Sequence, residues 1–205
     1  MRAYVEDYLK EEILDEGLVR NLPAFSEFLT IAALGDTQVT NFSTIARDCG
    51  VSSHTVKSYY EILCETIIGT FLPAFSPTLK RRTVKSPKFY FFDNGVVNQL
   101  ARRLPIQQRT PNFGLAFENW VFQEINSYNK YREIFAKLSY WRLETGHEVD
   151  FIINNMEVAV ECKSSEKITS DDLKGMKRLL NEHTPSRAIV IYRGEEKRKR
   201  WGNGT

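Results

Sequence analysis

Two acids and a lysine in the second half of the chain have the types and spacing for metal-dependent chemistry. Asp150 is followed by ten residues and then by Glu161, and Lys163 comes two residues later. Both acids lie in runs that alternate apolar and polar residues, 148–153 and 157–163, which is typical of strands with one buried face. The pattern therefore predicts a hairpin that carries charged groups on one side.

The turn between these strands decides how close the acids come. If residues 154–155, both Asn, form a two-residue turn, Ile153 pairs with Met156 and Asp150 lies opposite Ala159. Glu161 is then a diagonal neighbour of Asp150, within reach of a shared ion. The reverse face of this hairpin is expected to be wholly apolar, with Val149, Phe151, Ile153, Val158, Val160 and Cys162.

Two carboxylates with open positions for water and phosphate suit Mg²⁺ or Mn²⁺ better than zinc, which prefers His and Cys ligands. Lys163 would orient or deprotonate a water, or neutralise charge that develops on a phosphate. Glu118, on the preceding helix, is a candidate third ligand. The chemistry predicted is hydrolysis of a phosphodiester, with Asp150, Glu161 and Lys163 as catalytic residues and Glu118, Asp150 and Glu161 as metal ligands. The alternative is a solvated sheet face whose charges pair with one another.

The elements around this hairpin predict an α/β sandwich. Periodicity favours a helix at 113–129, strands at 137–143, 148–153 and 157–163, a second helix at 170–182 and a last strand at 187–192. The second domain is expected to span 112–205. A linker at 104–112, with two prolines and two glutamines, separates it from a first domain at 1–104.

The first domain carries the pattern of a helix-turn-helix. A helix is expected from Pro23 to Gly35, ahead of this pattern. Asn41 caps a helix at 42–49, Gly50 allows a left-handed turn, and a further helix runs from Ser52 or Ser53 to about residue 65. Two strand-like runs follow, at 67–75 and 88–92. Together these elements predict a winged helix whose wing is the segment between the two runs.

The wing is basic, which points to contacts with nucleic-acid phosphates. The expected contacts are Ser53, His54, Lys57 and Ser58 of the recognition helix and Lys80, Arg81, Arg82 and Lys85 of the wing. The same helix also carries Glu61 and offers no Arg for guanine readout, so binding is expected to be non-specific. The alternative is a module that contacts protein.

Composition limits the remaining classes. With 28 Lys plus Arg against 26 Asp plus Glu, the net charge of +2 excludes binding of polyanions by bulk charge. Cys49, Cys64 and Cys162 have neither disulfide nor metal spacing, which favours a reducing compartment. No stretch has the length of a membrane span or the pattern of a signal peptide, and a cytoplasmic location is expected.

The residues around the acids resemble a known family. Asp150, Glu161-Cys-Lys163 and Glu118 together look like the PD-(D/E)XK nuclease superfamily. The resemblance implies an α/β/α sandwich with a mixed sheet. The segments 88–95, 117–124, 140–142 and 146–151 also resemble DUF4143, the C-terminal region of prokaryotic AAA-type ATPases, and that resemblance extends from Tyr4 to about Arg200.

The DUF4143 resemblance implies a winged helix and a nuclease-like domain placed after a P-loop ATPase. No G-x-x-x-x-G-K-[ST] motif occurs, so no ATP site of that kind is expected. The chain is therefore expected to be a fragment. Its expected partners are the missing ATPase module and nucleic acid, DNA above all. The alternative function is a non-catalytic interaction or assembly module of the ATPase with a vestigial nuclease site.

Overall fold

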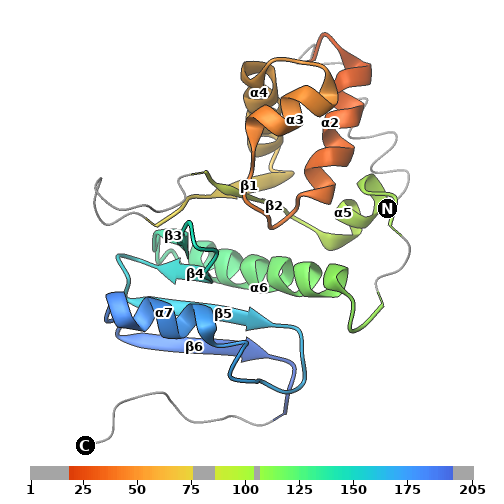
Figure 1. Ribbon diagram of the computed structural model, residues 1–205. Coiled ribbons are helices and arrows are strands. Elements are labelled where there is room, and N and C mark those ends of the chain that lie inside the picture. Colours follow the sequence, from red (N-terminus) through yellow and green to blue (C-terminus); the bar gives the residue numbers. More distant parts are fainter. Residues whose placement is uncertain (1–18, 76–85, 104–106, 196–205) are drawn as a thin grey trace, which may run out of the picture. The chain divides into compact units, whose positions relative to one another are not determined.

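The structure, a computed structural model, describes residues 19–75, 86–103 and 107–195. It is a mixed α/β protein that divides into two compact units. The first unit comprises residues 1–71 and 86–107, and the second comprises 72–85 and 108–205. The described residues form six helices and two sheets (Figure 1).

Three helices build the first unit around an aromatic core. They are α2 (Leu22–Leu34), α3 (Phe42–Cys49) and α4 (Ser53–Glu65), and each has a side-chain N-cap, from Asn21, Asn41 and Ser52 respectively. Gly50 ends α3 in the left-handed conformation at φ 65°, and the Val51 amide donates to the Ala46 carbonyl. The predicted helix-turn-helix pair is therefore present, with bounds close to those expected.

A small sheet completes the first unit. It consists of β1 (Gly69–Leu72) and β2 (Lys88–Phe91), shorter than the runs predicted for the wing. Val39 forms an antiparallel bridge to Lys88 beside them. Helix α5 (Asn94–Leu100) follows, capped by Asp93. The core joins rings from three helices and β2, including Phe25, Phe28, Tyr59, Tyr60 and Phe89.

The second unit is built on a four-stranded mixed sheet in the order β3-β4-β5-β6. The strands are β3 (Leu138–Arg142), β4 (Glu148–Ile153), β5 (Val158–Lys163) and β6 (Arg187–Tyr192), of which only β5 and β6 pair in parallel. All four strands predicted for this part of the chain are present, because each run contains enough β-branched and aromatic residues to form a half-buried strand. Ala74 bridges to Tyr140 and so extends the sheet past β3.

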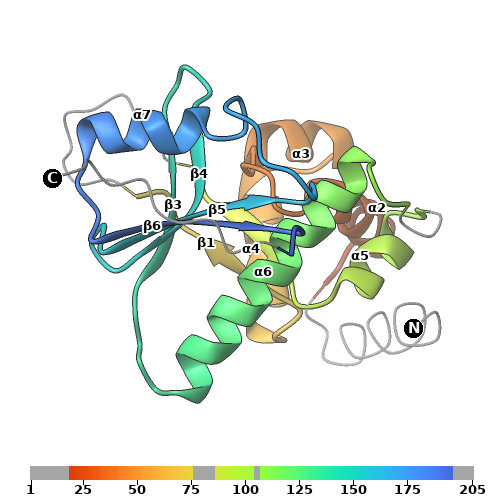
Figure 2. The ribbon, with the colours of Figure 1, turned by 90° about the horizontal axis from the view of Figure 1, so that it is seen from below.

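Two helices cover opposite faces of this sheet (Figure 2). Helix α6 (Pro111–Tyr131) packs Phe122 on Phe151, with ring centroids 5.9 Å apart. Helix α7 (Lys174–Glu182) buries Met176 and Leu179 against Ile152 and Ala159. The second unit is therefore a three-layered α/β/α arrangement.

The turn of the central hairpin differs from the prediction. Ile153 pairs with Val158 and Phe151 with Val160, so four residues, 154–157, form the turn. Asn154 and Met156 both have positive φ, and Met156 is buried in the core beside α7. The longer turn prevails over a two-residue turn because it buries the Met156 side chain. The slip of two residues does not by itself move a side chain to the other face, and it brings Asp150 level with Glu161.

Strand β4 contains a β-bulge that the alternation pattern does not reveal. Ser139 pairs with Ile152 and Trp141 with Val149, so one residue of β3 lies opposite two of β4, Asp150 and Phe151. Val149 and Ile152 consequently belong to the same core cluster, although strict alternation puts them on opposite faces. The prediction that Val149 shares a face with Phe151 is wrong for this reason.

No helix in the described part of the chain is long and apolar enough to cross a membrane.

The start of α7 approaches the backbone of β4 so closely that only glycine fits. A Cβ on Gly175 would clash with the carbonyl oxygen of Glu148. We expect Gly175→Ala to lower the free energy of unfolding by about 1–3 kcal/mol, because helix and strand must separate. Thermal and urea unfolding followed by circular dichroism measure this loss.

Gly114→Ala is the matched control, because Gly114 is also a helical glycine of the second unit and its Cβ would lie 3.6 Å from the Ser164 Oγ, an ordinary contact. It is expected to leave stability unchanged or raise it slightly, since alanine favours helix. Equal stability of the two variants would contradict the close approach of α7.

Candidate metal and phosphate site

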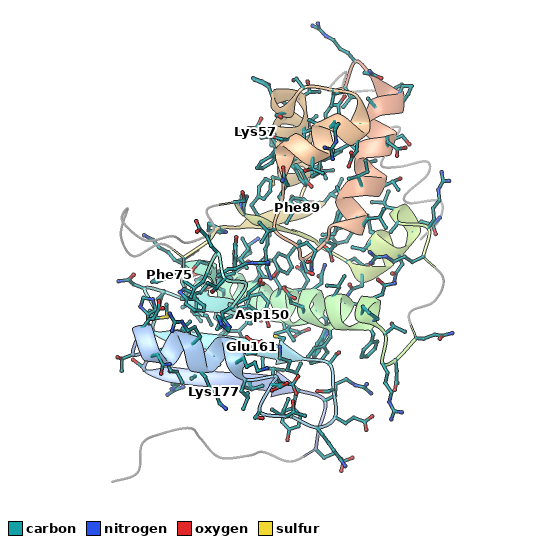
Figure 3. The ribbon with its side chains drawn as sticks, in the orientation of Figure 1. Lys57, Phe75, Phe89, Asp150, Glu161 and Lys177 are labelled. Carbon is teal, nitrogen blue, oxygen red and sulfur yellow. The ribbon has the colours of Figure 1, made fainter. Side chains whose placement is uncertain are left out.

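Asp150 lies in the bulge of β4 and is buried. Its Oδ2 accepts a hydrogen bond of 2.7 Å from the amide of Cys162, the residue after Glu161. The backbone pairing of β4 with β5 ends at Phe151 and Val160. Beyond that point the Asp150 carboxylate, and not a backbone carbonyl of β4, accepts the hydrogen bond from the Cys162 amide of β5. Asp150 is thereby fixed beside Glu161 (Figure 3).

Glu161 is the most constrained charged group of the site. Its side chain is 6% exposed, and its Oε1 accepts a hydrogen bond of 2.6 Å from Lys163 Nζ. Its Oε2 is buried without a hydrogen-bond partner in the described part of the protein. A buried carboxylate oxygen normally has a partner, and for this atom the described residues supply none.

Burial raises the pKa of Glu161 to about 7. The ammonium of Lys163 lowers the pKa of Glu161, but the carboxylates of Glu118 and Glu148 raise it again. Lys163 therefore offsets only part of the cost of removing the carboxylate from water.

Lys163 carries the positive charge of the site. Burial lowers the pKa of its ammonium, but the carboxylates of Glu161, Asp150 and Asp172 together raise it by more, so the net direction is upward. Lys163 is consequently protonated at neutral pH. Of the roles predicted for it, stabilising negative charge agrees with this state, whereas removing a proton from water does not.

Glu118 comes to the site from the other layer. It stands one turn before Phe122 on α6, the helix over the Phe151 face, whereas alternation along β5 puts Glu161 on the face with Ala159. The negative charge of Glu118 raises the pKa of Glu161. Among the described residues, no three His, Cys, Asp or Glu side chains are grouped closely enough to hold a metal ion.

The two acids on the sheet nevertheless fit a hard divalent cation. Mg²⁺ commonly binds through one or two carboxylates and keeps the rest of its shell for water and phosphate. Glu161 offers an oxygen without a hydrogen-bond partner among the described residues, and Asp150 adds a second buried carboxylate on the neighbouring strand. Both are oxygen donors, in agreement with magnesium or manganese and not with zinc.

Of the residues predicted to contact nucleic acid, Ser53, His54 and Lys57 lie on α4 of the first unit. His54 and Lys57 are exposed on α4, and Ser53 is half buried at its first turn. Lys57 Nζ stands over the Phe42 ring at 5.6 Å from its centroid. Lys80, Arg81, Arg82 and Lys85 of the wing lie outside the described residues.

One acid near the site, Asp172, was not predicted. Asp172 precedes α7 and raises the pKa of Lys163, while hydrogen bonds from Thr169 lower its own pKa despite the opposing effect of burial. Glu148 pairs with Arg142 across the strands at 2.7 Å. The Thr169-x-x-Asp172 spacing, which resembles a capping box, is the signal from which Asp172 could have been found.

Ionisation of Glu161 gives stability a pH dependence. Because its pKa is raised to about 7 in the folded chain, folding takes up a proton between that value and the ordinary pKa near 4.5. The free energy of unfolding therefore falls as pH rises through this window, by on the order of 2 kcal/mol. Glu161→Gln removes this contribution, so wild type should lose stability relative to the variant from pH 5 to pH 8.

Urea unfolding of both proteins in EDTA at pH 5, 6, 7 and 8 measures this difference. Glu157→Gln, an exposed acid in the same hairpin turn, serves as the control and should track the wild type. A constant difference between wild type and Glu161→Gln across these pH values would contradict the raised pKa.

Comparison with known proteins places the chain among conserved domains. Residues 1–108 match the family described as "Domain of unknown function (DUF8612)", and residues 113–205 match "Domain of unknown function (DUF4143)". The DUF4143 match thus begins at residue 113 and not near Tyr4, because a separate family describes the first half. No solved structure matches the chain.

Two relatives are the uncharacterized protein Rv2008c of Mycobacterium tuberculosis and the uncharacterized protein Mb2031c of Mycobacterium bovis. Each is 20% identical over 198 residues, which cover 95% of this chain and 44% of the relative. The chain therefore spans less than half the length of these relatives. By its matches, the chain belongs to the DUF8612 family over its first half and carries a DUF4143 domain in its second.

Proposed function

We propose that the second unit is a PD-(D/E)XK nuclease-like domain that hydrolyses phosphodiesters with a bound divalent cation. The observation that carries this proposal is the buried Glu161 Oε2, which lacks a partner among the described residues and stands beside Asp150 and the Lys163 ammonium. Two buried carboxylates next to a fixed cation suit a metal and a phosphate together.

The order of elements supports the same proposal. A helix precedes three antiparallel strands, and a second helix leads to a strand parallel to β5, with one helix on each face. This is the arrangement that the PD-(D/E)XK resemblance implies. Asp150 of β4 and the Glu161-Cys-Lys163 run of β5 occupy neighbouring strands, as that motif requires.

The residues have separable roles in such a reaction. Asp150 and Glu161 would hold Mg²⁺ or Mn²⁺, which supplies Lewis-acid stabilisation of the attacked phosphate. Water forms the new P–O bond and loses a proton to solvent, and the ester P–O bond breaks as its oxygen gains a proton. Lys163 stabilises the negative charge that builds up on the non-bridging oxygens, and its salt link to Glu161 holds it in place.

The first unit is proposed as a winged helix that binds nucleic acid by contacting the sugar-phosphate backbone of the nucleic acid. Support comes from α3, α4 and the β1–β2 sheet, from the Val39 bridge that adds a third strand position, and from the exposed His54 and Lys57 of α4. Readout through phosphates alone favours DNA binding without sequence preference.

A second candidate function is a non-catalytic assembly module of an AAA-type ATPase. It is favoured by the 2.6 Å link between Lys163 and Glu161, which already neutralises part of the acid charge, and by the lack of a three-acid group among the described residues. Metal binding separates the two candidates, because a vestigial site binds no ion at millimolar concentration.

Metal binding and cleavage are expected to depend on different residues. Titration calorimetry with Mn²⁺ at pH 8 should give a saturable heat for the wild type that Glu161→Ala and Asp150→Ala remove. Lys163→Ala should keep the heat but reduce Mn²⁺-dependent cleavage of single-stranded, duplex and branched DNA by roughly 10²–10³-fold.

Glu157→Ala is the control, since it removes an exposed acid from the same hairpin. It should keep both metal binding and cleavage. Absence of any saturable heat in the wild type, with no cleavage above the Lys163→Ala level, would reject the nuclease proposal and leave the assembly module.

Duplex binding by the proposed winged helix should depend strongly on salt. If the four basic residues of the wing each neutralise a phosphate, the logarithm of the affinity should fall with the logarithm of salt concentration with a slope of roughly −3 to −4. Charge reversal at Lys80, Arg81, Arg82 and Lys85 should bring that slope close to zero. Fluorescence anisotropy with a labelled duplex measures it, and an unchanged slope would contradict DNA contact by the wing.

A further inference from the structure

A patch of exposed aromatic rings lies where α6 ends. Tyr128 is 60% exposed, Tyr131 87% and Phe135 77%. Ile134 is also half exposed beside them. Rings of this size are normally buried, so three of them exposed within eight residues mark a surface for a binding partner.

Hydrogen bonds tie the loop that carries Phe135 to the end of α6, the helix that carries Tyr128 and Tyr131. The Asn129 side chain accepts a hydrogen bond of 2.8 Å from the Ala136 amide and donates one of 2.9 Å to the Ala136 carbonyl. The Ile134 amide also donates to the Asn129 carbonyl at 3.0 Å. Glu133 and Phe135 have positive φ, a conformation unfavourable for these residue types. The hydrogen bonds thus stabilise a strained backbone conformation in which the rings lie outside the core.

Positive charge is interleaved with the rings. Lys130, Arg132 and Lys137 are exposed in the same ten-residue segment, against the single acid Glu133. The Asn154 amide donates to the Lys137 carbonyl at 2.7 Å, which fixes the end of the segment to the turn of the central hairpin. Exposed aromatic rings and exposed cations therefore occur together in one short segment.

We propose that this aromatic patch, formed by residues 128–137, binds single-stranded nucleic acid. Bases stack on Tyr131 and Phe135, and the neighbouring cations contact phosphates, the combination by which single strands are held without sequence preference. A duplex does not fit this role, because its bases are stacked on one another.

The composition favours this ligand over two others. Lysine is depleted in protein interfaces, yet two lysines flank these rings. A membrane surface would require a continuous apolar face, whereas the tyrosines alternate with charged side chains.

The patch is separate from the acidic site. Tyr131 follows Glu118 on α6 by thirteen residues, which places it roughly 20 Å further along the helix axis. Binding there requires neither the metal nor cleavage, so this inference goes beyond the proposed nuclease function and stands or fails independently of it.

The test measures binding of a fluorescent dT20 oligonucleotide to the full chain by anisotropy, in EDTA and at 50 mM salt. The double variant Tyr131→Ala/Phe135→Ala should weaken binding at least about tenfold. Tyr131→Phe, which keeps the ring, should retain it. Lys130→Glu/Lys137→Glu should weaken binding and reduce its salt dependence.

Controls separate this surface from the rest of the chain. Lys174→Ala, which removes an exposed lysine of α7, should leave dT20 binding within about twofold of the wild type. Circular dichroism confirms that each variant is folded, and Mn²⁺ calorimetry on the double variant should match the wild type. Loss of the manganese heat in wild type and variant alike would concern the acidic site alone.

Three results would overturn the proposal. The first is dT20 binding by Tyr131→Ala/Phe135→Ala within twofold of wild type. The second is a wild-type dimer, seen by light scattering, that this variant converts to monomer while dT20 does not bind, which would assign the patch to a second copy. The third is co-sedimentation with phosphatidylcholine–phosphatidylglycerol vesicles in place of dT20 binding, which would assign it to a lipid surface.

Discussion

The Glu161 carboxylate is buried with two oxygens in different situations, and the arrangement of the second unit depends on it. Oε1 is neutralised by Lys163, whereas Oε2 has no partner among the described residues. Burying a carboxylate costs several kcal/mol, and one lysine at the rim does not recover all of that free energy. A protein shaped only for stability would replace such a group with an apolar one. Its presence in the middle of a sheet supports the metal-binding role that we propose.

The elements around this carboxylate explain why it stays in place. Helix α6 covers one face of the sheet through Phe122, and α7 covers the other through Met176 and Leu179. Neither helix can move away without exposing apolar surface, so the strands that carry Asp150 and Glu161 keep a fixed separation. The Asp150 carboxylate joins the two strands directly through the Cys162 amide. The site is therefore part of the sheet and not a loop attached to it.

Much of this architecture could be predicted from the sequence, because local patterns determine it. The caps at Asn41 and Ser52, the left-handed Gly50 and the strand runs of the second half all depend on near neighbours in the chain. The side of the sheet that carries Glu161 and Lys163 follows from alternation along one strand. The register did not follow, because it depends on burial of Met156 against α7, a tertiary contact with no local signal. The same holds for the charge of Asp172 acting on Lys163 from a separate segment.

The β-bulge at Asp150 divides β4 into a part that holds the core and a part that serves the site. Val149 and Ile152 anchor the strand on either side of the extra residue, so the apolar layer beneath α7 does not rely on the aspartate. Exchange of this acid for another side chain would therefore leave the apolar layer intact. The residue that would serve binding and the residues that hold the fold are thus distinct positions along one strand.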